Sequence, residues 1–237
     1  MASHPQLAET VVTIPRTCGI AADGCEKFIE ENDLIYTKEA SDAEIESKFL
    51  KCRLPEWLRR DLRIIAWRCR FPLSVRSSSL LEDGLFRPYA GLYETYFLHN
   101  TSSDENIRLQ ELENAIKLIY ASTWFSSPQA FARSAGGGRK DAMAVIIQEV
   151  VGKDYNGFWY PAISGVAQSH NYYPIMNMKA EEGIAHIALG MGKTVVEGEK
   201  SLRFSPAHPE RIIQFSSVDD ILDNSQNQFY ALDVSED

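Results

Sequence analysis

The feature that most constrains the fold is a change of hydrophobic pattern beyond the middle of the 237-residue chain. Before residue 140, apolar residues recur mainly at helical spacing, whereas from Ala142 the pattern is typical of strands. Helices and strands that do not alternate regularly favour an α+β fold over a doubly wound sheet. We therefore expect a helix-rich part, residues 1–140, followed by a part built on a mixed or antiparallel sheet, residues 141–237.

Local signals set the expected elements. Ser41 is suited to N-cap one helix and Pro55 to open another, whose apolar stripe comprises Trp57, Leu58, Leu62, Ile65 and Ala66. The expected helices are Ala22–Asn32, Asp42–Lys51, Pro55 to the Phe71-Pro72 stop, Asp104–Ser122 (with Ile107 on its apolar face) and Pro128–Ser134. The expected strands are Leu73–Arg76, Tyr93–Leu98, Ala142–Val151, Phe158–Ser164, Val166–Ser169, Ile184–Leu189, Arg211–Phe215 and Phe229–Leu232.

Composition excludes several functional classes. A formal net charge of -9 argues against nucleic-acid and anionic-membrane surfaces, which need Lys and Arg. The longest apolar run is Ala142–Ile147, far short of a membrane span, and Glu9 interrupts any signal-peptide core, so we expect a cytoplasmic protein. The 4 cysteines form no C-x-x-C pair and no histidine shows ligand spacing; we expect reduced, mostly buried thiols and no metal site among them.

The sharpest local feature is the segment Leu73–Ser79, in which Arg76 is followed by three serines. A guanidinium fork beside hydroxyl and backbone N–H groups suits the oxygens of a phosphate. The competing interpretation is a surface ion pair of Arg76, with Glu82 or Asp83, beside a helix-capping serine run. The residues alone leave both open.

The surrounding sequence resembles the phosphoenolpyruvate synthase and pyruvate, phosphate dikinase family. Val75-Arg76-Ser77-Ser78, then Glu82-Asp83 and Tyr89–Thr95, are similar to its V-R-S-S…E-D…F-A-G-x-x-[DE]-T signature. Further segments resemble family motifs in the same order: Ile14–Ile20, Met143–Val151, Ser164–Ala167 and Gly190–Gly198. The resemblance implies an ATP-grasp-like fold that binds ATP.

The resemblance also implies site residues. Arg76, beside Ser77, would contact the phosphates, with Leu92 or Tyr93 near the adenine or ribose. Arg133 aligns with a family arginine, and phosphate contact or surface pairing is equally open for it. Gln148, Glu149 and Val150 would form the hinge that reads the base, facing Arg76 across one cleft. Ser164 and Gly165 would bring backbone close to the phosphates. A planar base needs an apolar slot, and phosphates need cations and N–H donors.

Several family features are missing. No Gly-Gly-Lys-Gly segment precedes Ile14, Lys193 replaces the Glu of the G-x-G-E motif, and His186 stands where an acidic residue is frequent. The run Gly136–Lys140 lacks the G-K-[ST] order of a phosphate loop, and we interpret it as a connection. Nothing from Ala231 onward supplies the family's carboxylates, so ligands of Mg²⁺ are expected outside this chain.

The expected function is therefore that of a dikinase fragment, inactive in isolation. Its parent would use ATP to phosphorylate pyruvate through a phosphohistidine, and the partners would be the phosphohistidine domain and the pyruvate-binding barrel. One alternative is a non-catalytic ATP-grasp remnant with a regulatory or scaffolding role. Another is a dikinase with a different acceptor, such as a glucan or an antibiotic.

Overall fold

A computed structural model describes residues 10–34, 40–79, 93–134, 143–174 and 178–235. The chain divides into two compact units, Met1–Val150 and Val151–Asp237. Helices and antiparallel sheets are both present, which confirms the α+β class. The first unit extends past the boundary expected at residue 140, because the strand Met143–Glu149 pairs with strands of that unit on both sides.

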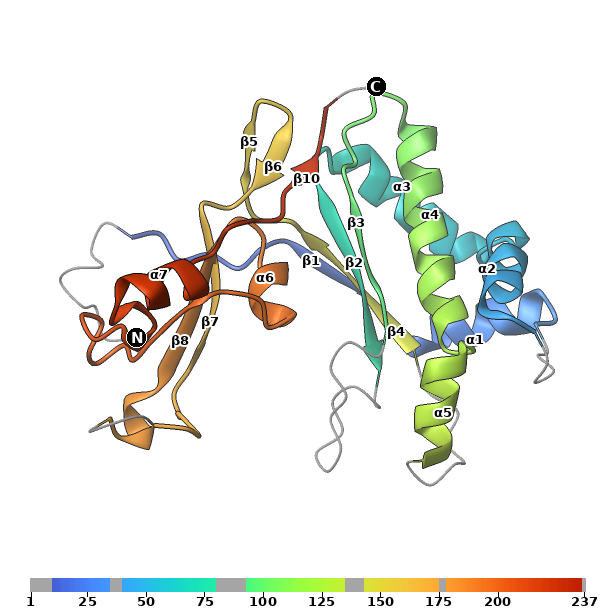
Figure 1. Cartoon of the computed structure of the whole chain (residues 1–237). Coiled ribbons are helices and arrows are strands. Elements are labelled where there is room, and N and C mark those ends of the chain that lie inside the picture. Colours follow the sequence, from blue (N-terminus) through green and yellow to red (C-terminus); the bar gives the residue numbers. More distant parts are fainter. Residues whose placement is uncertain (1–9, 35–39, 80–92, 135–142, 175–177, 236–237) are drawn as a thin grey trace. The chain divides into compact units, whose positions relative to one another are not determined.

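The first unit is built on one four-stranded sheet with the order β1-β4-β2-β3 (Figure 1). Its strands are β1 (Thr17–Ile20), β2 (Leu73–Ser79), β3 (Thr95–Leu98) and β4 (Met143–Glu149). Every neighbouring pair is antiparallel, and β2 and β4 pair along their whole length from Leu73↔Glu149 to Ser79↔Met143. This register decides which side chains share a face, because successive residues of a strand point to opposite sides.

Helices cover one side of this sheet (Figure 1). They are α1 (Ala22–Glu31), α2 (Asp42–Lys51), α3 (Glu56–Arg68), α4 (Glu105–Ser122) and α5 (Ser126–Ser134). The core between helices and sheet contains fully buried side chains from both, including Phe28, Val75, Ile116, Tyr120 and Val145. The helix positions follow the sequence closely because their end signals are local: Ser41 and Glu44 form a complete capping box at the start of α2.

Two apolar positions in these helices were predicted wrongly. α3 buries Leu58, Leu62 and Ala66 as expected, but Trp57 is 39% exposed. Ile107, in the first turn of α4, is 47% exposed. Both residues lie in the first turn of their helix. Hydrophobic spacing does not show whether a neighbouring element extends far enough to cover that turn.

The second unit contains two three-stranded antiparallel sheets, with the orders β10-β6-β5 and β7-β8-β9. The strands are β5 (Lys153–Tyr155), β6 (Phe158–Tyr160), β7 (Ile163–Gln168), β8 (Ile184–Leu189), β9 (Leu202–Phe204) and β10 (Leu232–Asp233). Short helical pieces join them: η2 (Ala180–Glu182), α6 (Lys193–Val196), η3 (Ile213–Phe215) and α7 (Val218–Asn224). β8 has the bounds that its hydrophobic pattern predicts.

Other strand predictions in this unit were wrong. The expected strand Phe158–Ser164 is divided between β6 and β7 around Pro161, which has no N–H to donate to a ladder. The expected strand Arg211–Phe215 ends in the 3-10 turn η3 instead. Of Phe229–Leu232, Leu232 alone is in a strand.

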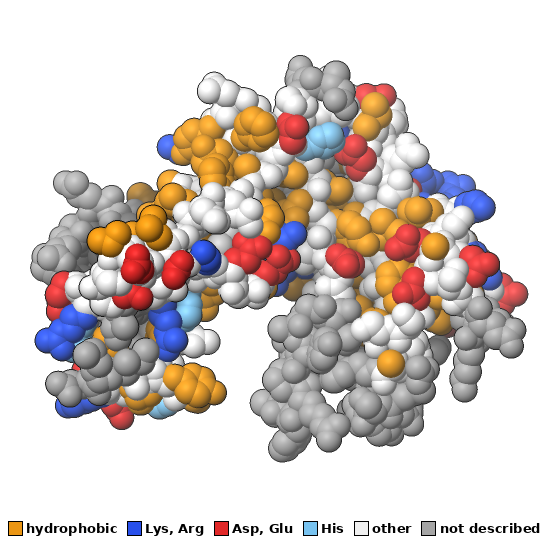
Figure 2. All heavy atoms as spheres, viewed as in Figure 1, with side chains coloured by type: hydrophobic (Ala, Val, Ile, Leu, Met, Phe, Trp, Pro, Cys, Tyr) orange, Lys and Arg blue, Asp and Glu red, His pale blue; other side chains and the backbone are white. Residues whose placement is uncertain are grey.

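Aromatic side chains gather at the β5–β6 hairpin, where Figure 2 shows a hydrophobic group on the surface. The rings of Tyr155 and Tyr160 stack at 4.4 Å, and Phe229 lies 5.1 Å from Tyr160. Phe158 is 51% exposed. The hairpin is therefore stabilised by cross-strand ring contacts and leaves part of its apolar surface exposed.

Two global expectations concern cysteines and membranes. The four cysteines are free thiols. Cys25 is buried, Cys52 and Cys69 are half-buried and Cys18 is exposed, so the expectation of mostly buried thiols was wrong.

Within the described parts of the chain, no helix is both long enough and apolar enough to span a bilayer.

Candidate functional site

The four-stranded sheet has a second face, turned away from the helices, which we call the open face. Its members alternate with the core positions and follow from the strand register: Thr17, Gly19, Ser74, Arg76, Ser78, Thr95, Phe97, Ala144, Ile146 and Gln148. The core side chains Val75, Val145 and Ile147 point the other way and are almost fully buried. The open face therefore brings Arg76 and Gln148 onto one surface.

Arg76 and Gln148 lie side by side, which corrects the expectation that they face each other across a cleft. β2 and β4 are hydrogen-bonded neighbours, with Arg76 opposite Ile146 and Ser74 opposite Gln148. Arg76 is exposed, and it has no ion-pair partner within the described ranges. Phe97, 41% exposed, and the exposed Thr95 continue the face on β3. A cation here adjoins apolar and hydroxyl groups.

The Gln148 side chain is fixed by a short hydrogen-bond chain. Its Nε2 donates to Thr17 Oγ1 at 2.9 Å, and Thr17 Oγ1 donates to the carbonyl oxygen of Pro15 at 2.9 Å. The Gln148 carbonyl oxygen accepts a bond from Ser74 Oγ at 3.2 Å. The amide therefore has one settled orientation on the open face before any ligand arrives.

Glu149 and Val150 are tied into the first unit. Their backbone N–H groups donate to the carbonyl oxygens of Arg16 and Pro72, both at 2.9 Å. Glu149 accepts two bonds from the Arg16 guanidinium, at 2.9 and 3.2 Å, and this hydrogen bonding with Arg16 lowers the pKa of the Glu149 carboxyl. Arg16 also lies 3.9 Å above the Phe71 ring. These amide hydrogens are thus already used inside the unit.

Two other predicted residues of the first unit, Ser77 and Tyr93, do not share the open face. Ser77 pairs with Val145 and so points to the helix side. Tyr93 is 7% exposed and belongs to the hydrophobic core. Arg133 lies in the last turn of α5, and Leu92 falls outside the described residues, as do Glu82, Asp83 and the Gly136–Lys140 run. The sequence motif identified the segment that contains these residues, but it did not show toward which face of the sheet each side chain points.

In the second unit, Ser164 and Gly165 occupy β7, and their contacts are internal. Ser164 Oγ donates to the carbonyl oxygen of Gly190. A Cβ on Gly165 would overlap the carbonyl oxygen of His186 on β8 and come within 2.9 Å of Ile187 Cγ2. The glycine is therefore required by the close approach of two strands.

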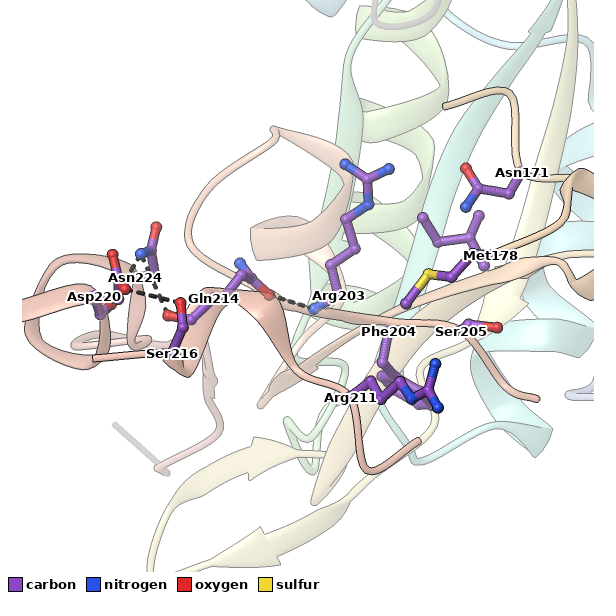
Figure 3. Close-up of a pocket in the computed structure, with 11 residues that line it drawn as sticks. Asn171, Met178, Arg203, Phe204, Ser205, Arg211, Gln214, Ser216, Asp220 and Asn224 are labelled. Atoms are coloured by element: carbon purple, nitrogen blue, oxygen red, sulfur yellow. Dashed lines mark hydrogen bonds between the residues drawn. The ribbon is translucent and has the colours of Figure 1, made fainter. Parts of the chain in front are cut away.

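A hollow of about 390 Å³ in this unit was not identified from the sequence (Figure 3). It lies beside β9, where the backbone N–H of Arg203 donates to Gln214 Oε1 at 2.7 Å. Ser205 is 2% exposed, and its Oγ has no hydrogen-bond partner among the described residues. Burial, followed by the nearby Arg203 charge, lowers the pKa of His186 on β8. No motif marks this region, because its residues come from separate segments that meet only in the folded unit, as Arg203 meets Gln214 and Gln214 meets Asn224.

No metal centre is found where side chains are described: those ranges hold no group of three His, Cys, Asp or Glu that could bind an ion. The G-x-G-E position is occupied by Lys193, whose Nζ lies 3.5 Å from Glu197 and 4.8 Å from the centre of the Tyr230 ring. Lys193 therefore has a local partner in the C-cap residue of α6 and an aromatic neighbour.

Comparison with known proteins identifies the family. The family model described as "Pyruvate phosphate dikinase, AMP/ATP-binding domain" matches residues 1–228. The chain belongs to this family. This match confirms the resemblance that the sequence motifs indicated, and it agrees with the ATP-grasp-like α+β fold. The chain is therefore an ATP-binding domain of a phosphotransferase family.

One curated relative matches part of the chain. The prodigiosin synthesizing transferase PigC of Serratia marcescens is 34% identical over 88 residues. The match covers 37% of this chain and 9% of that protein. Because the match covers so little of PigC, the activity of PigC cannot be assigned to this chain.

Proposed function

We propose that this domain holds ATP on the open face of its four-stranded sheet, for a dikinase of the phosphoenolpyruvate synthase type. The parent protein would phosphorylate pyruvate through a phosphohistidine, in the cytoplasm. The phosphohistidine domain and the pyruvate-binding barrel would be its partners. The family assignment supports ATP binding, and the remaining steps are inferred from it.

The observation that carries the proposal is the exposed Arg76 guanidinium beside the apolar Ile146 and Phe97. A planar guanidinium binds phosphate oxygens with paired, charge-assisted hydrogen bonds. Apolar side chains on the same face suit a base, which gains from an apolar surface with few polar groups. The preset Gln148 amide offers one such polar group.

The proposal also includes the other nucleotide contacts that the family resemblance implies. Arg133 would add a second cation, and Leu92 or Tyr93 would lie near the base or ribose. Ser77 would contribute through its backbone, because its side chain points to the helices. Gln148, Glu149 and Val150 would form the hinge. Ser164 and Gly165 near the phosphates rest on the family resemblance alone.

The described residues fit nucleotide binding better than catalysis. They can contact a triphosphate, offer an apolar surface to a base and supply one cation. Mg²⁺ bound at the phosphates would neutralise charge during transfer. The family resemblance implies carboxylates that the sequence from Ala231 onward does not supply, so we infer that the ligands for Mg²⁺ come from outside this chain.

Calorimetric titration with ATP tests the proposal. Arg76→Ala should weaken binding about 10-fold to 100-fold, the value of one charge-assisted contact, and Arg76→Lys should weaken it less. Arg53→Ala is the matched control, since Arg53 is an exposed arginine paired with Glu56 at 2.8 Å. Unchanged affinity in Arg76→Ala, or no binding by the unmodified chain, would contradict it.

A second candidate is a non-catalytic nucleotide-binding domain with a regulatory or scaffolding role. It is favoured by Lys193, which replaces the motif carboxylate and pairs with Glu197. The full-length parent would then bind ATP without becoming phosphorylated on histidine. Autophosphorylation assays on the parent separate the two candidates, and candidate acceptors such as pyruvate, glucans and antibiotics can be compared in the same assay.

A further inference from the structure

The hollow beside β9 contains polar groups to which the nucleotide site gives no role. Its described lining residues all belong to the second unit, between Asn171 and Asn224. Its volume of about 390 Å³ falls within the range of small-molecule sites in proteins, about 300–1,000 Å³. Met178, Ile184 and Phe204 give it apolar walls, and its other described lining residues are polar or charged. A ligand here would therefore meet both kinds of surface.

The hydroxyl group of Ser205, which lines the hollow, lacks a partner. Ser205 is 2% exposed, and its Oγ makes no hydrogen bond within the described residues. An unpaired buried hydroxyl is unfavourable, and most buried polar groups are paired with protein, water or ligand atoms. A ligand that brings an acceptor oxygen into the hollow would supply the missing partner.

Arg203 and Asn171 present further donors, and both are held at Tyr173. Asn171 Oδ1 accepts the backbone N–H of Tyr173 at 3.0 Å, and Arg203 Nη2 donates to the carbonyl oxygen of Tyr173 at 3.4 Å. Asn171 is 4% exposed, and its Nδ2 donates to no atom of the described residues. Figure 3 shows Asn171 and Arg203 on the same side of β9. A guanidinium and an amide NH₂ group thus lie close together with donor capacity to spare.

The acidic residue of the hollow lies at a different end. Asp220 accepts hydrogen bonds from the hydroxyl groups of Ser217 and Ser216, at 2.7 and 2.9 Å. These bonds lower the pKa of the Asp220 carboxyl, so it is a carboxylate with its own donors. Figure 3 shows Asp220 away from Asn171 and Ser205. The donor end of the hollow is therefore not occupied by this carboxylate.

Other charged groups around the hollow also have local partners. Glu210 lies 3.6 Å from Arg211, which Figure 3 shows on the other side of β9 from Arg203. Glu182 lies 3.5 Å from His208 and accepts a backbone N–H at 3.1 Å. Arg203 forms no ion pair within the part of the chain that the structure describes. The donor end thus has a cation without a counter-ion.

We propose that the hollow binds a small hydroxy or oxo monocarboxylic acid. Its carboxylate would lie against the Arg203 guanidinium and the Asn171 amide, because a planar fork of N–H groups matches a carboxylate. Its short carbon chain would lie along Met178 and Ile184, and its further oxygen would accept from Ser205. Apolar walls and a single free guanidinium favour such a ligand over inorganic phosphate. The proposal does not rest on ATP binding, because the open face belongs to the first unit.

Methyl NMR of the full chain tests the proposal, with the methyl groups of Met178 and Ile184 as reporters. Butyrate should shift both signals with a dissociation constant of about 1–10 mM, and inorganic phosphate should bind about tenfold more weakly. The better of 3-hydroxybutyrate and 4-hydroxybutyrate should bind about threefold to tenfold more tightly than butyrate, because one hydrogen bond is added. Ser205→Ala should remove this difference and leave butyrate binding unchanged.

Substitutions at the donor end test the carboxylate contact. Arg203→Gln should weaken butyrate binding about tenfold or more, because a charge-assisted contact is lost. Asn171→Asp keeps the acceptor for the Tyr173 N–H but replaces the NH₂ group by a negative oxygen, so it should weaken binding by a similar factor. Arg211→Gln is the matched control, since this exposed arginine pairs with Glu210, and it should change the affinity less than about twofold.

Circular dichroism checks that each variant keeps the native fold. No shift at about 50 mM butyrate, or phosphate binding as tight as that of butyrate, would overturn the proposal. Equal losses in Arg211→Gln and Arg203→Gln, or a hydroxybutyrate preference that survives Ser205→Ala, would do the same. Displacement of butyrate by ATP would assign the hollow to the nucleotide site and would also overturn it.

Discussion

Arg76 and Ile146 lie directly opposite each other in neighbouring strands of the first sheet. The same register places Gly19 beside Ile146 on β1 and Thr95 beside Arg76 on β3. A row of four residues therefore crosses the open face. In order, it offers a glycine without a side chain, the apolar group of Ile146, the cation of Arg76 and the hydroxyl of Thr95. This row gives a nucleotide a flat surface at one end and a phosphate contact at the other.

The bare end of this row gives the first prediction. A Cβ added to Gly19 would meet no atom within 4 Å, so a larger residue fits without strain and fills the space above the open face. Gly19→Phe should keep the fold and weaken ATP binding about tenfold or more, because the ring occupies the surface next to Ile146. Calorimetry measures the affinity, and circular dichroism checks the fold.

The matched control is Gly19→Ala, which adds one methyl group and should bind ATP almost normally. Native-like binding by Gly19→Phe would show that the nucleotide does not use this part of the open face.

The Arg16–Glu149 pair predicts a dependence of stability on pH. Hydrogen bonds from Arg16 lower the pKa of Glu149, so the folded state favours the charged carboxylate. The stability that this adds is fully present above the ordinary pKa of a glutamate, about 4.3, and is lost as the pH falls through the lower folded value. In Glu149→Gln this contribution should be absent at every pH.

Urea unfolding of both proteins between about pH 3 and pH 7 measures the effect. The difference in unfolding free energy should be largest near pH 7 and should shrink towards the acid end. A difference that does not change with pH would mean that the carboxylate charge adds no stability here.

Elements with local end signals could be predicted from the sequence. α2 begins where Ser41 and Glu44 form a capping box, and β8 has the bounds given by its apolar run. The hairpin of β5 and β6 was missed although it carries a local signal: Asn156 and Gly157 both have positive φ, at 56° and 88°, as a two-residue hairpin turn requires. β9 is only three residues long and has no such signal.

The candidate site was predictable in part. The family motif identified the segment of Arg76 and the strand of Gln148, and the structure places both on one face. Tyr93 lies in the core and Ser77 points to the helices, because the strand register decides side-chain direction and depends on contacts far along the chain. The proximity of Gly165 to His186 is likewise a tertiary feature.

That proximity gives a prediction on stability. Gly165→Ala would force a methyl group onto the backbone of β8, so it should destabilise the second unit by about 1–3 kcal/mol. Gly192→Ala is the control, because its added Cβ would lie an ordinary 3.6 Å from Ser164 Cβ. Hydrogen exchange of the β7 and β8 amides measures the local stability. Equal effects of the two substitutions would contradict the steric explanation.

Ser205 and Ser164, both in the second unit, differ in whether their hydroxyl groups are hydrogen-bonded. Ser205 is almost fully buried, and its Oγ lacks a hydrogen-bond partner in the described residues, so its desolvation is not compensated. Ser205→Ala should leave stability unchanged or raise it by up to about 1 kcal/mol. Ser164→Ala removes a hydroxyl that donates to the Gly190 carbonyl and should cost about 1 kcal/mol. Thermal unfolding of the two variants gives the comparison. A loss of more than about 1 kcal/mol in Ser205→Ala would indicate that a bound water satisfies the hydroxyl in the hollow.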